Sequence, residues 1–190
     1  KICADEHEVW EAADEMLGKR LVTQQTGPKG KMISRLYVEE ATSITAEFYL
    51  SLVLDRCSER IMIVASAAGG MDIEEVAKNN PQAIVNISVE PAVGIQKFQA
   101  REIAFALGLE AKQVNQAVTV IEACYRAFRD LDATMVEINP LVVTEDGRLV
   151  ALDAKMAFDD NALFRRQQIS ELRDKSQEDP LEMKAADRGL

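Results

Sequence analysis

The sequence is poor in the residues that most often carry covalent catalysis or metal binding. Its only histidine, His7, lies on the polar side of a predicted helix, where we expect a solvated surface residue. The three cysteines, Cys3, Cys57 and Cys124, form no Cys-x-x-Cys pair, which excludes a disulfide framework or a cysteine metal site and indicates a reducing, cytoplasmic setting. No Gly-x-Ser-x-Gly motif and no Cys/His pair is available for covalent catalysis. If the chain belongs to an enzyme, we expect the covalent step to occur on another domain or another chain.

Basic residues and long apolar runs are also scarce. The 22 Lys and Arg are outnumbered by 32 Asp and Glu, and the net charge of −10 disfavours binding to nucleic acid phosphates. The longest apolar runs are much shorter than the ~18 residues of a membrane span, and no signal peptide is visible, so we expect no membrane partner. Hydrophobic residues make up 47% and charged residues 28%, which is typical of a globular protein of one domain or two small lobes.

The order of the periodic segments predicts an α+β fold. Apolar side chains recur at helical spacing in some segments, whereas others are rich in Val, Ile and aromatic residues with short connections that favour antiparallel strands. Strands come first, then helices, then a hairpin, which differs from a regular βαβ alternation. The predicted elements are a helix at 6–17, strands at 32–39, 47–56, 60–66 and 84–91, a short helix within 67–79, helices at 96–109 and from 114 onward, and a hairpin at 137–155.

The hairpin carries three polar residues inside apolar runs, where a buried carboxylate is costly without a partner: Glu137, Asn139 and Asp153. Side chains at i and i+2 of a strand share a face, so Glu137 and Asn139 point the same way. Whether Asp153 joins them depends on the length of the turn, because a shift of one residue moves every side chain to the other face.

Two turns are compatible with the sequence. A three-residue Glu145-Asp146-Gly147 loop, with Gly in the left-handed conformation, pairs Thr144 with Arg148 and sets Asn139 opposite Asp153. A two-residue Asp-Gly turn opposes Asn139 to Ala154 instead. In the first register a carboxylate and an amide oxygen converge, with Glu137 a pleat away, and hard oxygen ligands of this kind suit Mg²⁺ shared with nucleotide phosphates. The alternative is a polar patch on a solvated sheet face.

A second group of polar residues consists of Glu39 at the end of one predicted strand, Glu47 at the start of the next, and Thr42 between them. The free backbone groups of a strand end can bind a purine edge, and a carboxylate a few residues on can accept hydrogen bonds from two ribose hydroxyls. The alternative is a charged β-turn. The glycines of AAGGM (67–71) match no phosphate-loop pattern, because no Gly-Lys-Ser/Thr follows them, and predict a plain turn.

Six segments of the chain form a recognisable set: MLGKRLVTQQTGPKGK, RLYVEEATSITAEFYLSLVLDR, AAGGMDIEEVAK, ATMVEINPLVV, ALDAKMAFDDNALFR and SQEDP. Together they resemble one family, the β subunits of succinate–CoA ligases (succinyl-CoA synthetases). The resemblance covers nearly the whole chain without evident gaps. Within the family, EPAVGIQKFQAREIAFALGL and CYRAFRDLDATMVEINP are most similar to the malate–CoA ligase (malate thiokinase) members.

The resemblance implies an ATP-grasp fold, with two α+β lobes holding ATP, and an ADP-forming reaction of ATP, a dicarboxylate and CoA. It implies Asn139 and Asp153 as Mg²⁺ ligands, and a carboxylate at Glu137 that steadies a phosphohistidine carried by the α subunit of the heteromer. It implies nucleotide contacts for three further positions: Glu39, Thr42 and Glu47, the last at the ribose.

The resemblance also implies that 1–190 is an incomplete ATP-grasp domain. The chain begins at Lys1 without Met, and the family's Lys and Gly-rich phosphate loop are expected before it. The charged segment 170–190 is expected to lead to a CoA-ligase domain that binds most of the CoA. We expect the isolated chain to bind Mg·ATP weakly and to be inactive, which calorimetric titration can test. The alternatives are a biotin-carboxylase-like ligase and a non-catalytic assembly module. The residues leave open malate or succinate, ATP or GTP, and an αβ or larger assembly.

Overall fold

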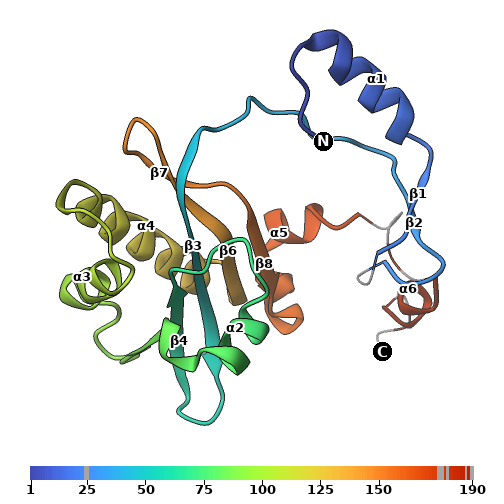
Figure 1. Cartoon of the computed structure of the whole chain (residues 1–190). Coiled ribbons are helices and arrows are strands. Elements are labelled where there is room, and N and C mark those ends of the chain that lie inside the picture. Colours follow the sequence, from blue (N-terminus) through green and yellow to red (C-terminus); the bar gives the residue numbers. More distant parts are fainter. Residues whose placement is uncertain (24–25, 175–177, 179, 187, 189–190) are drawn as a thin grey trace. The chain divides into compact units, whose positions relative to one another are not determined.

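The computed structural model describes residues 1–23, 26–174, 178, 180–186 and 188. The chain divides into two compact units, one formed by Lys1–Thr42 with Arg173–Leu190 and the other by Ser43–Leu172. The larger unit contains an antiparallel sheet in the order β5-β4-β3-β6-β7, and β8 pairs with β6 beyond the end of β7 (Figure 1). The strands of this sheet are β3 (Ile44–Asp55), β4 (Arg60–Ser66), β5 (Ile84–Val89), β6 (Ala133–Thr144), β7 (Leu149–Ala151) and β8 (Ala154–Phe158).

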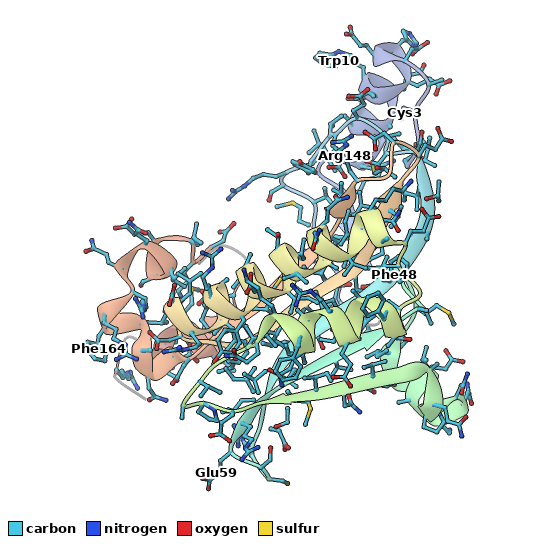
Figure 2. All side chains as sticks on the ribbon, turned by 90° about the vertical axis from the view of Figure 1, so that its left-hand side faces the viewer. Cys3, Trp10, Phe48, Glu59, Arg148 and Phe164 are labelled. Atoms are coloured by element: carbon cyan, nitrogen blue, oxygen red, sulfur yellow. The ribbon has the colours of Figure 1, made fainter. Side chains whose placement is uncertain are left out.

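One face of the sheet is covered by two helices, α3 (Lys97–Ala106) and α4 (Ala111–Asp130), which lie side by side in Figure 1. Figure 2 brings them to the front and labels Phe48, a core residue of β3. The repeat predicted from Val114 onward forms the buried face of α4, since an apolar stripe at helical spacing must be covered. The strand side chains under these helices are Phe48, Leu50, Leu52, Val136, Ile138, Leu141 and Val143.

The opposite face, here called the site face, is defined by the alternate residues of the same strands. Because neighbouring side chains of a strand point to opposite sides, the burial of Phe48 and Leu50 under α3 and α4 turns Glu47 and Tyr49 to the site face. Glu137 lies between the core residues of β6 and points the same way. The segment that leaves β4 passes across β3 and β6 toward α2 (Ile73–Asn79) in Figure 1. Asp72 caps α2 by accepting a hydrogen bond from the Glu74 N–H.

The smaller unit contains the predicted N-terminal helix, α1 (Glu6–Met16), and a two-stranded ribbon of β1 (Arg20–Leu21) and β2 (Lys31–Met32). The strand predicted at 32–39 is wrong, since sheet pairing ends at Met32. Tyr37 and Val38 are 86% and 61% exposed. Apolar and aromatic residues favour a strand only where a partner strand and a covering layer receive them.

The remaining elements are short: the 3₁₀ helices η1 (Pro81–Ala83) and η2 (Asp160–Arg165), and the helices α5 (Gln167–Glu171) and α6 (Pro180–Ala186). Part of the charged segment 170–190 is therefore helical. Most of the SQEDP motif, together with Gln24 and Gln25 of the first motif, lies outside the described residues. In the described ranges, no helix combines the length and apolar composition needed to cross a bilayer.

Candidate functional site

The turn between β6 and β7 adopts the three-residue form. Gly147 has a φ of 78°, in the left-handed region, and the Thr144 N–H donates to the Arg148 carbonyl at 3.0 Å. The register continues along the ribbon, so that the Asn139 N–H donates to the Asp153 carbonyl at 3.2 Å. The prediction that Asn139 faces Asp153 is confirmed, and the two-residue alternative is wrong.

The turn is held from the side by α4. The Gln116 side chain donates to the Gly147 carbonyl at 3.1 Å and accepts from the Leu149 N–H at 2.9 Å. Within the turn, the Asp146 carboxylate accepts hydrogen bonds from Thr144 and Arg148, which lower the pKa of Asp146 below its ordinary value. A helix outside the hairpin therefore helps to fix the register that brings the polar residues together.

The Asn139 side chain is fixed by the loop after β4. Its Oδ1 accepts from the Gly70 N–H at 2.8 Å, and its Nδ2 donates to the Met71 carbonyl at 3.2 Å. The donor and the acceptor assign the two ends of the amide, and an amide oxygen has a second lone pair free for a ligand. Asn139 is half-buried, and these two hydrogen bonds hold its side-chain oxygen at a defined place on the sheet.

Asp153 is exposed, and in the described part of the chain no hydrogen bond or ion pair holds its carboxylate. The described residues also contain no cluster of three His, Cys, Asp or Glu side chains that could hold a metal ion without other ligands. A carboxylate and an amide oxygen facing each other fit Mg²⁺, which keeps several waters and takes further oxygens from phosphate groups. The predicted pair therefore fits a shared cation site rather than an all-protein cage.

Glu137 is held by a tyrosine that the sequence reasoning missed. The Tyr49 hydroxyl donates to Glu137 Oε2 at 2.9 Å from the neighbouring strand β3. Burial raises the pKa of Tyr49 to about 12, the Ser51 hydroxyl opposes this rise, and the Glu137 carboxylate adds to it. The hydroxyl therefore stays protonated and donating at neutral pH. The available signal was the spacing from Glu47, because residues two apart on a strand share a face.

The three predicted nucleotide residues occupy different parts of the fold. Glu47 is exposed on β3 in the larger unit. Glu39 is exposed and Thr42 half-buried in the smaller unit, on the segment between β2 and β3 that has no regular secondary structure. Thr42 lies just before β3, which begins at Ile44 and so earlier than the predicted start at Glu47, and no long strand ends at Glu39.

The glycine turn at 67–71 contacts the predicted site residues. The Gly69 N–H donates to the Glu47 carbonyl at 3.3 Å, and the next N–H, of Gly70, binds Asn139. The motif is a turn, as predicted, but the sequence did not indicate which residues it would contact. Two adjacent glycines directly after a buried strand were the available signal, since such a pair permits a close approach of backbones.

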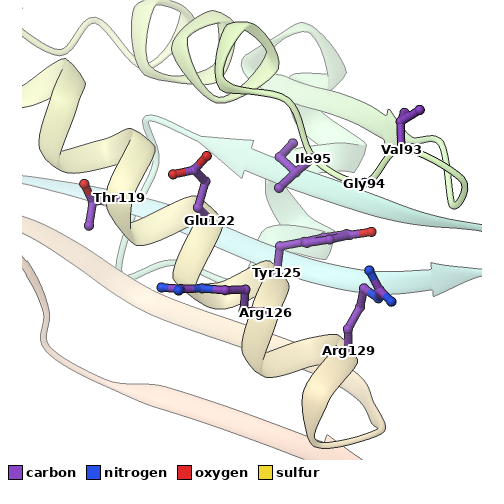
Figure 3. Close-up of a pocket in the computed structure, with 8 residues that line it drawn as sticks. All are labelled: Val93, Gly94, Ile95, Thr119, Glu122, Tyr125, Arg126 and Arg129. Atoms are coloured by element: carbon purple, nitrogen blue, oxygen red, sulfur yellow. The ribbon is translucent and has the colours of Figure 1, made fainter.

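A pocket of about 370 Å³ lies apart from these residues, between α4 and the segment that leads into α3. Figure 3 shows Glu122, Tyr125 and Arg129 along α4, with the Tyr125 ring extending toward the segment that carries Gly94 and Val93. Its lining mixes one carboxylate with two guanidinium groups, those of Arg126 and Arg129. None of the predicted site residues lines this pocket.

Comparison with known proteins identifies relatives over the full chain. The chain is 63% identical over 190 residues to a protein of Mesorhizobium japonicum named "Probable malate--CoA ligase subunit beta", covering 100% of the chain and 48% of the relative. It is 53% identical to a succinate–CoA ligase [ADP-forming] subunit beta of Paramagnetospirillum magneticum, again covering 100% of the chain and 48% of the relative. The resemblance predicted from the motifs is confirmed, and the chain spans about half the length of these curated relatives.

The fold and the family agree. ATP citrate lyase from Methanothrix soehngenii, solved in complex with citrate and coenzyme A, superposes with a TM-score of 0.64 at 20% identity, covering 88% of this chain and 37% of that one. This likeness concerns the fold, an arrangement of antiparallel strands and packed helices that matches the predicted α+β class. The model of the ATP-grasp domain matches residues 1–143. The chain therefore belongs to the ATP-grasp domain family.

Proposed function

We propose that the chain is the nucleotide-binding part of the β subunit of an ADP-forming dicarboxylate–CoA ligase. The overall reaction converts ATP, a dicarboxylate and CoA into an acyl-CoA, ADP and phosphate. The observation that carries the proposal is the pairing of Asn139 with Asp153 on a sheet face that also holds Glu47 and Glu137. The names of the relatives, which match over the whole chain, support the same reaction class.

In this proposal Asn139 and Asp153 hold Mg²⁺ together with phosphate oxygens and water. Asn139 contributes the Oδ1 lone pair that Gly70 does not use, and Asp153 contributes a carboxylate without a protein partner in the described ranges. When bound, the cation neutralises phosphate charge during transfer. The residues themselves orient the nucleotide and keep both oxygens on one side of the sheet.

Glu39, Thr42 and Glu47 contact the nucleoside in the proposed site. Glu47 is exposed on the site face, and its carboxylate can accept hydrogen bonds from two ribose hydroxyls. Thr42 and Glu39 belong to the extended segment before β3, whose backbone groups can bind the edge of the base. The Gly-rich phosphate loop of the family is proposed to lie outside residues 1–190.

Glu137 is proposed to steady a phosphohistidine that the α subunit presents at the ATP site. One carboxylate oxygen accepts from Tyr49, and the other can accept the ring N–H of an imidazole and hold its tautomer. The chain supplies no nucleophile in this scheme, which agrees with the exposed position of its only histidine. The His7 side chain is 80% exposed.

The proposal also covers the acid substrate, the partner subunit and the cellular compartment. The 63% identity to a protein named as a malate–CoA ligase makes malate the first acid to test, with succinate second. CoA is proposed to bind mainly in a further domain, toward which 170–190 would lead. A cytoplasmic heteromer with an α subunit is proposed, and the free thiols of Cys3, Cys57 and Cys124 agree with a reducing compartment.

The test uses the full-length subunit assembled with its partner. Asn139→Ala and Asp153→Ala should each lower the rate of acyl-CoA formation by at least about 100-fold while the heteromer still assembles, as size-exclusion chromatography can show. Asn115→Ala, on the exposed side of α4, is the matched control and should keep full activity. Unchanged activity in both site variants would contradict the metal site. Assays with malate and succinate side by side identify the acid.

A further inference from the structure

The loop from Ala67 to Asp72 lies directly against the backbone of β3. A side chain at Gly69 would place its Cβ 2.3 Å from the Phe48 nitrogen and 2.5 Å from the Glu47 carbonyl carbon. Strand backbone cannot move away from such a contact without disrupting the sheet, so this position requires glycine. The loop is therefore fixed at a set height above the site face.

The next residue, Gly70, lies between two of the proposed ligand-binding side chains. Its N–H donates to Asn139 Oδ1 at 2.8 Å. A Cβ at Gly70 would lie 2.5 Å from Glu47 Oε2, so the carboxylate occupies the space that glycine leaves open. One backbone residue therefore contacts Asn139 through its N–H and limits the position of Glu47 through its missing side chain.

A side chain at Gly70 would displace the Glu47 carboxylate but would not remove the hydrogen bond to Asn139. The atom that a Gly70 side chain would meet is the far end of an exposed glutamate, which can rotate away at little cost in stability. The N–H that binds Asn139 would remain. An alanine at this position is therefore expected to displace the Glu47 carboxylate while leaving the sheet and the Asn139 contact in place.

We propose that Gly70 is a positioning residue of the nucleotide site, which sets where the Glu47 carboxylate stands relative to the Asn139 amide. The ligand concerned is a magnesium-bound nucleoside triphosphate, whose ribose and phosphates must reach the two side chains at once. The inference rests on the proposed function, because it takes Glu47 as the ribose contact and Asn139 as the metal contact. The AAGGM motif by itself indicated only a turn, and did not indicate that Gly70 would position the Glu47 carboxylate.

The first test compares two glycines with the same backbone conformation. Gly70 has a φ of 68° and Gly108 a φ of 76°, and nothing lies within 4 Å of a Cβ at Gly108. In the full-length heteromer, Gly70→Ala should raise the KM for ATP about tenfold, the size of one lost hydrogen bond to a charged group. Gly108→Ala carries the same left-handed strain and should stay within about twofold of the parent in KM.

Other readouts separate positioning from general damage. In Gly70→Ala, kcat and the half-saturating Mg²⁺ concentration should stay within about twofold of the parent, because the N–H to Asn139 remains. Thermal stability should fall by the same amount in the two alanine variants. If Gly70→Ala fails to assemble, Gly70→Asn with Gly108→Asn repeats the comparison with a side chain that tolerates the left-handed region.

A double-mutant cycle tests whether Gly70 acts through Glu47. In the Glu47→Ala background, Gly70→Ala should change the KM for ATP no more than Gly108→Ala does, since the group it displaces is absent. A Gly70→Ala effect on KM that persists in full without the carboxylate overturns the positioning role.

The proposed function and this inference can fail separately. If Glu47→Ala leaves the KM for ATP unchanged, the nucleotide role of Glu47 is wrong and the positioning role falls with it. If Glu47→Ala raises the KM but Gly70→Ala behaves like Gly108→Ala, only the positioning role is overturned.

Discussion

Asn139 and Asp153 face each other across the β6 ribbon, joined by a hydrogen bond of 3.2 Å from the Asn139 N–H to the Asp153 carbonyl. Residues directly opposite in an antiparallel pair carry their side chains on the same face. The side chains of Asn139 and Asp153 therefore lie on the same face because of the strand register, and the register depends on the turn at Gly147 and on its contact with Gln116.

Removing the contact from α4 should loosen the turn. Gln116→Ala loses the hydrogen bonds to Gly147 and Leu149, whose backbone groups are then left without these partners. We expect the free energy of unfolding to fall by about 1–3 kcal/mol, measured by urea denaturation. Asn115→Ala, the exposed neighbour on the same helix, should change it by less than about 0.5 kcal/mol. Equal effects of the two variants would show that the turn holds without this contact.

Replacing Tyr49 by Phe removes the hydroxyl that holds Glu137. At neutral pH, Tyr49→Phe should lower the free energy of unfolding by about 1–2 kcal/mol, and Tyr37→Phe, at a site 86% exposed, should have no effect. Burial raises the pKa of Tyr49 from 10.0 to about 12, so its contribution is fully present below pH 10 and is lost as the pH rises through about 12. Urea unfolding between pH 8 and pH 12 checks this. A difference that grows above pH 10 would contradict it.

The start of β6 is tied to η2 by a charge cluster. Asp132 accepts hydrogen bonds from Arg165 and Arg166, which lower the pKa of Asp132 below its ordinary value of 3.8. Its contribution is present above pH 3.8 and is lost as the pH falls through the lowered value. Asp132→Asn should therefore destabilise the protein at pH 7 more than in acid, measured by urea unfolding at both.

The choice of Asn in this variant separates charge from backbone effects. Asp132 has a φ of 53°, and Asn adopts the left-handed region as readily as Asp does. Asp130→Asn, exposed at the end of α4, serves as the control. A destabilisation by Asp132→Asn that is the same at pH 7 and in acid would exclude the ion pairs as its cause.

The cysteines should differ sharply in reactivity. Burial raises the pKa of the Cys124 thiol to about 11, whereas Cys57 is exposed in the turn between β3 and β4. At pH 8 the folded protein should react with iodoacetamide at Cys57 at least about 100-fold faster than at Cys124, because the thiolate is the reactive form. Peptide mass spectrometry measures both sites. In urea the two rates should become similar, and a fast reaction of Cys124 in the folded protein would contradict its burial.

Local sequence patterns predicted most helices and strands of the larger unit, because the apolar residues that recur at regular spacing are the ones that the fold buries. The face of α4 from Val114 to Phe128 and the strands around Leu50 are apolar where the fold covers them. The strand predicted at 32–39 failed for the opposite reason, since Tyr37 and Val38 have strand propensity but find no partner strand among the residues that the structure describes. Propensity describes a residue alone, whereas a strand also requires a neighbour.

The sequence by itself predicted Asn139 and Asp153 as Mg²⁺ ligands and Glu39, Thr42 and Glu47 as nucleotide contacts, from polar residues at set positions of predicted strands together with the family resemblance. It left two turns open, and the tertiary structure decided between them through Gly147 and Gln116. The sequence also did not predict that Gly70 would contact Asn139 and Glu47, or that the Tyr49 hydroxyl would donate a hydrogen bond to Glu137. These contacts join segments far apart in the chain, and they exist only once β3, β4 and β6 are paired in one register.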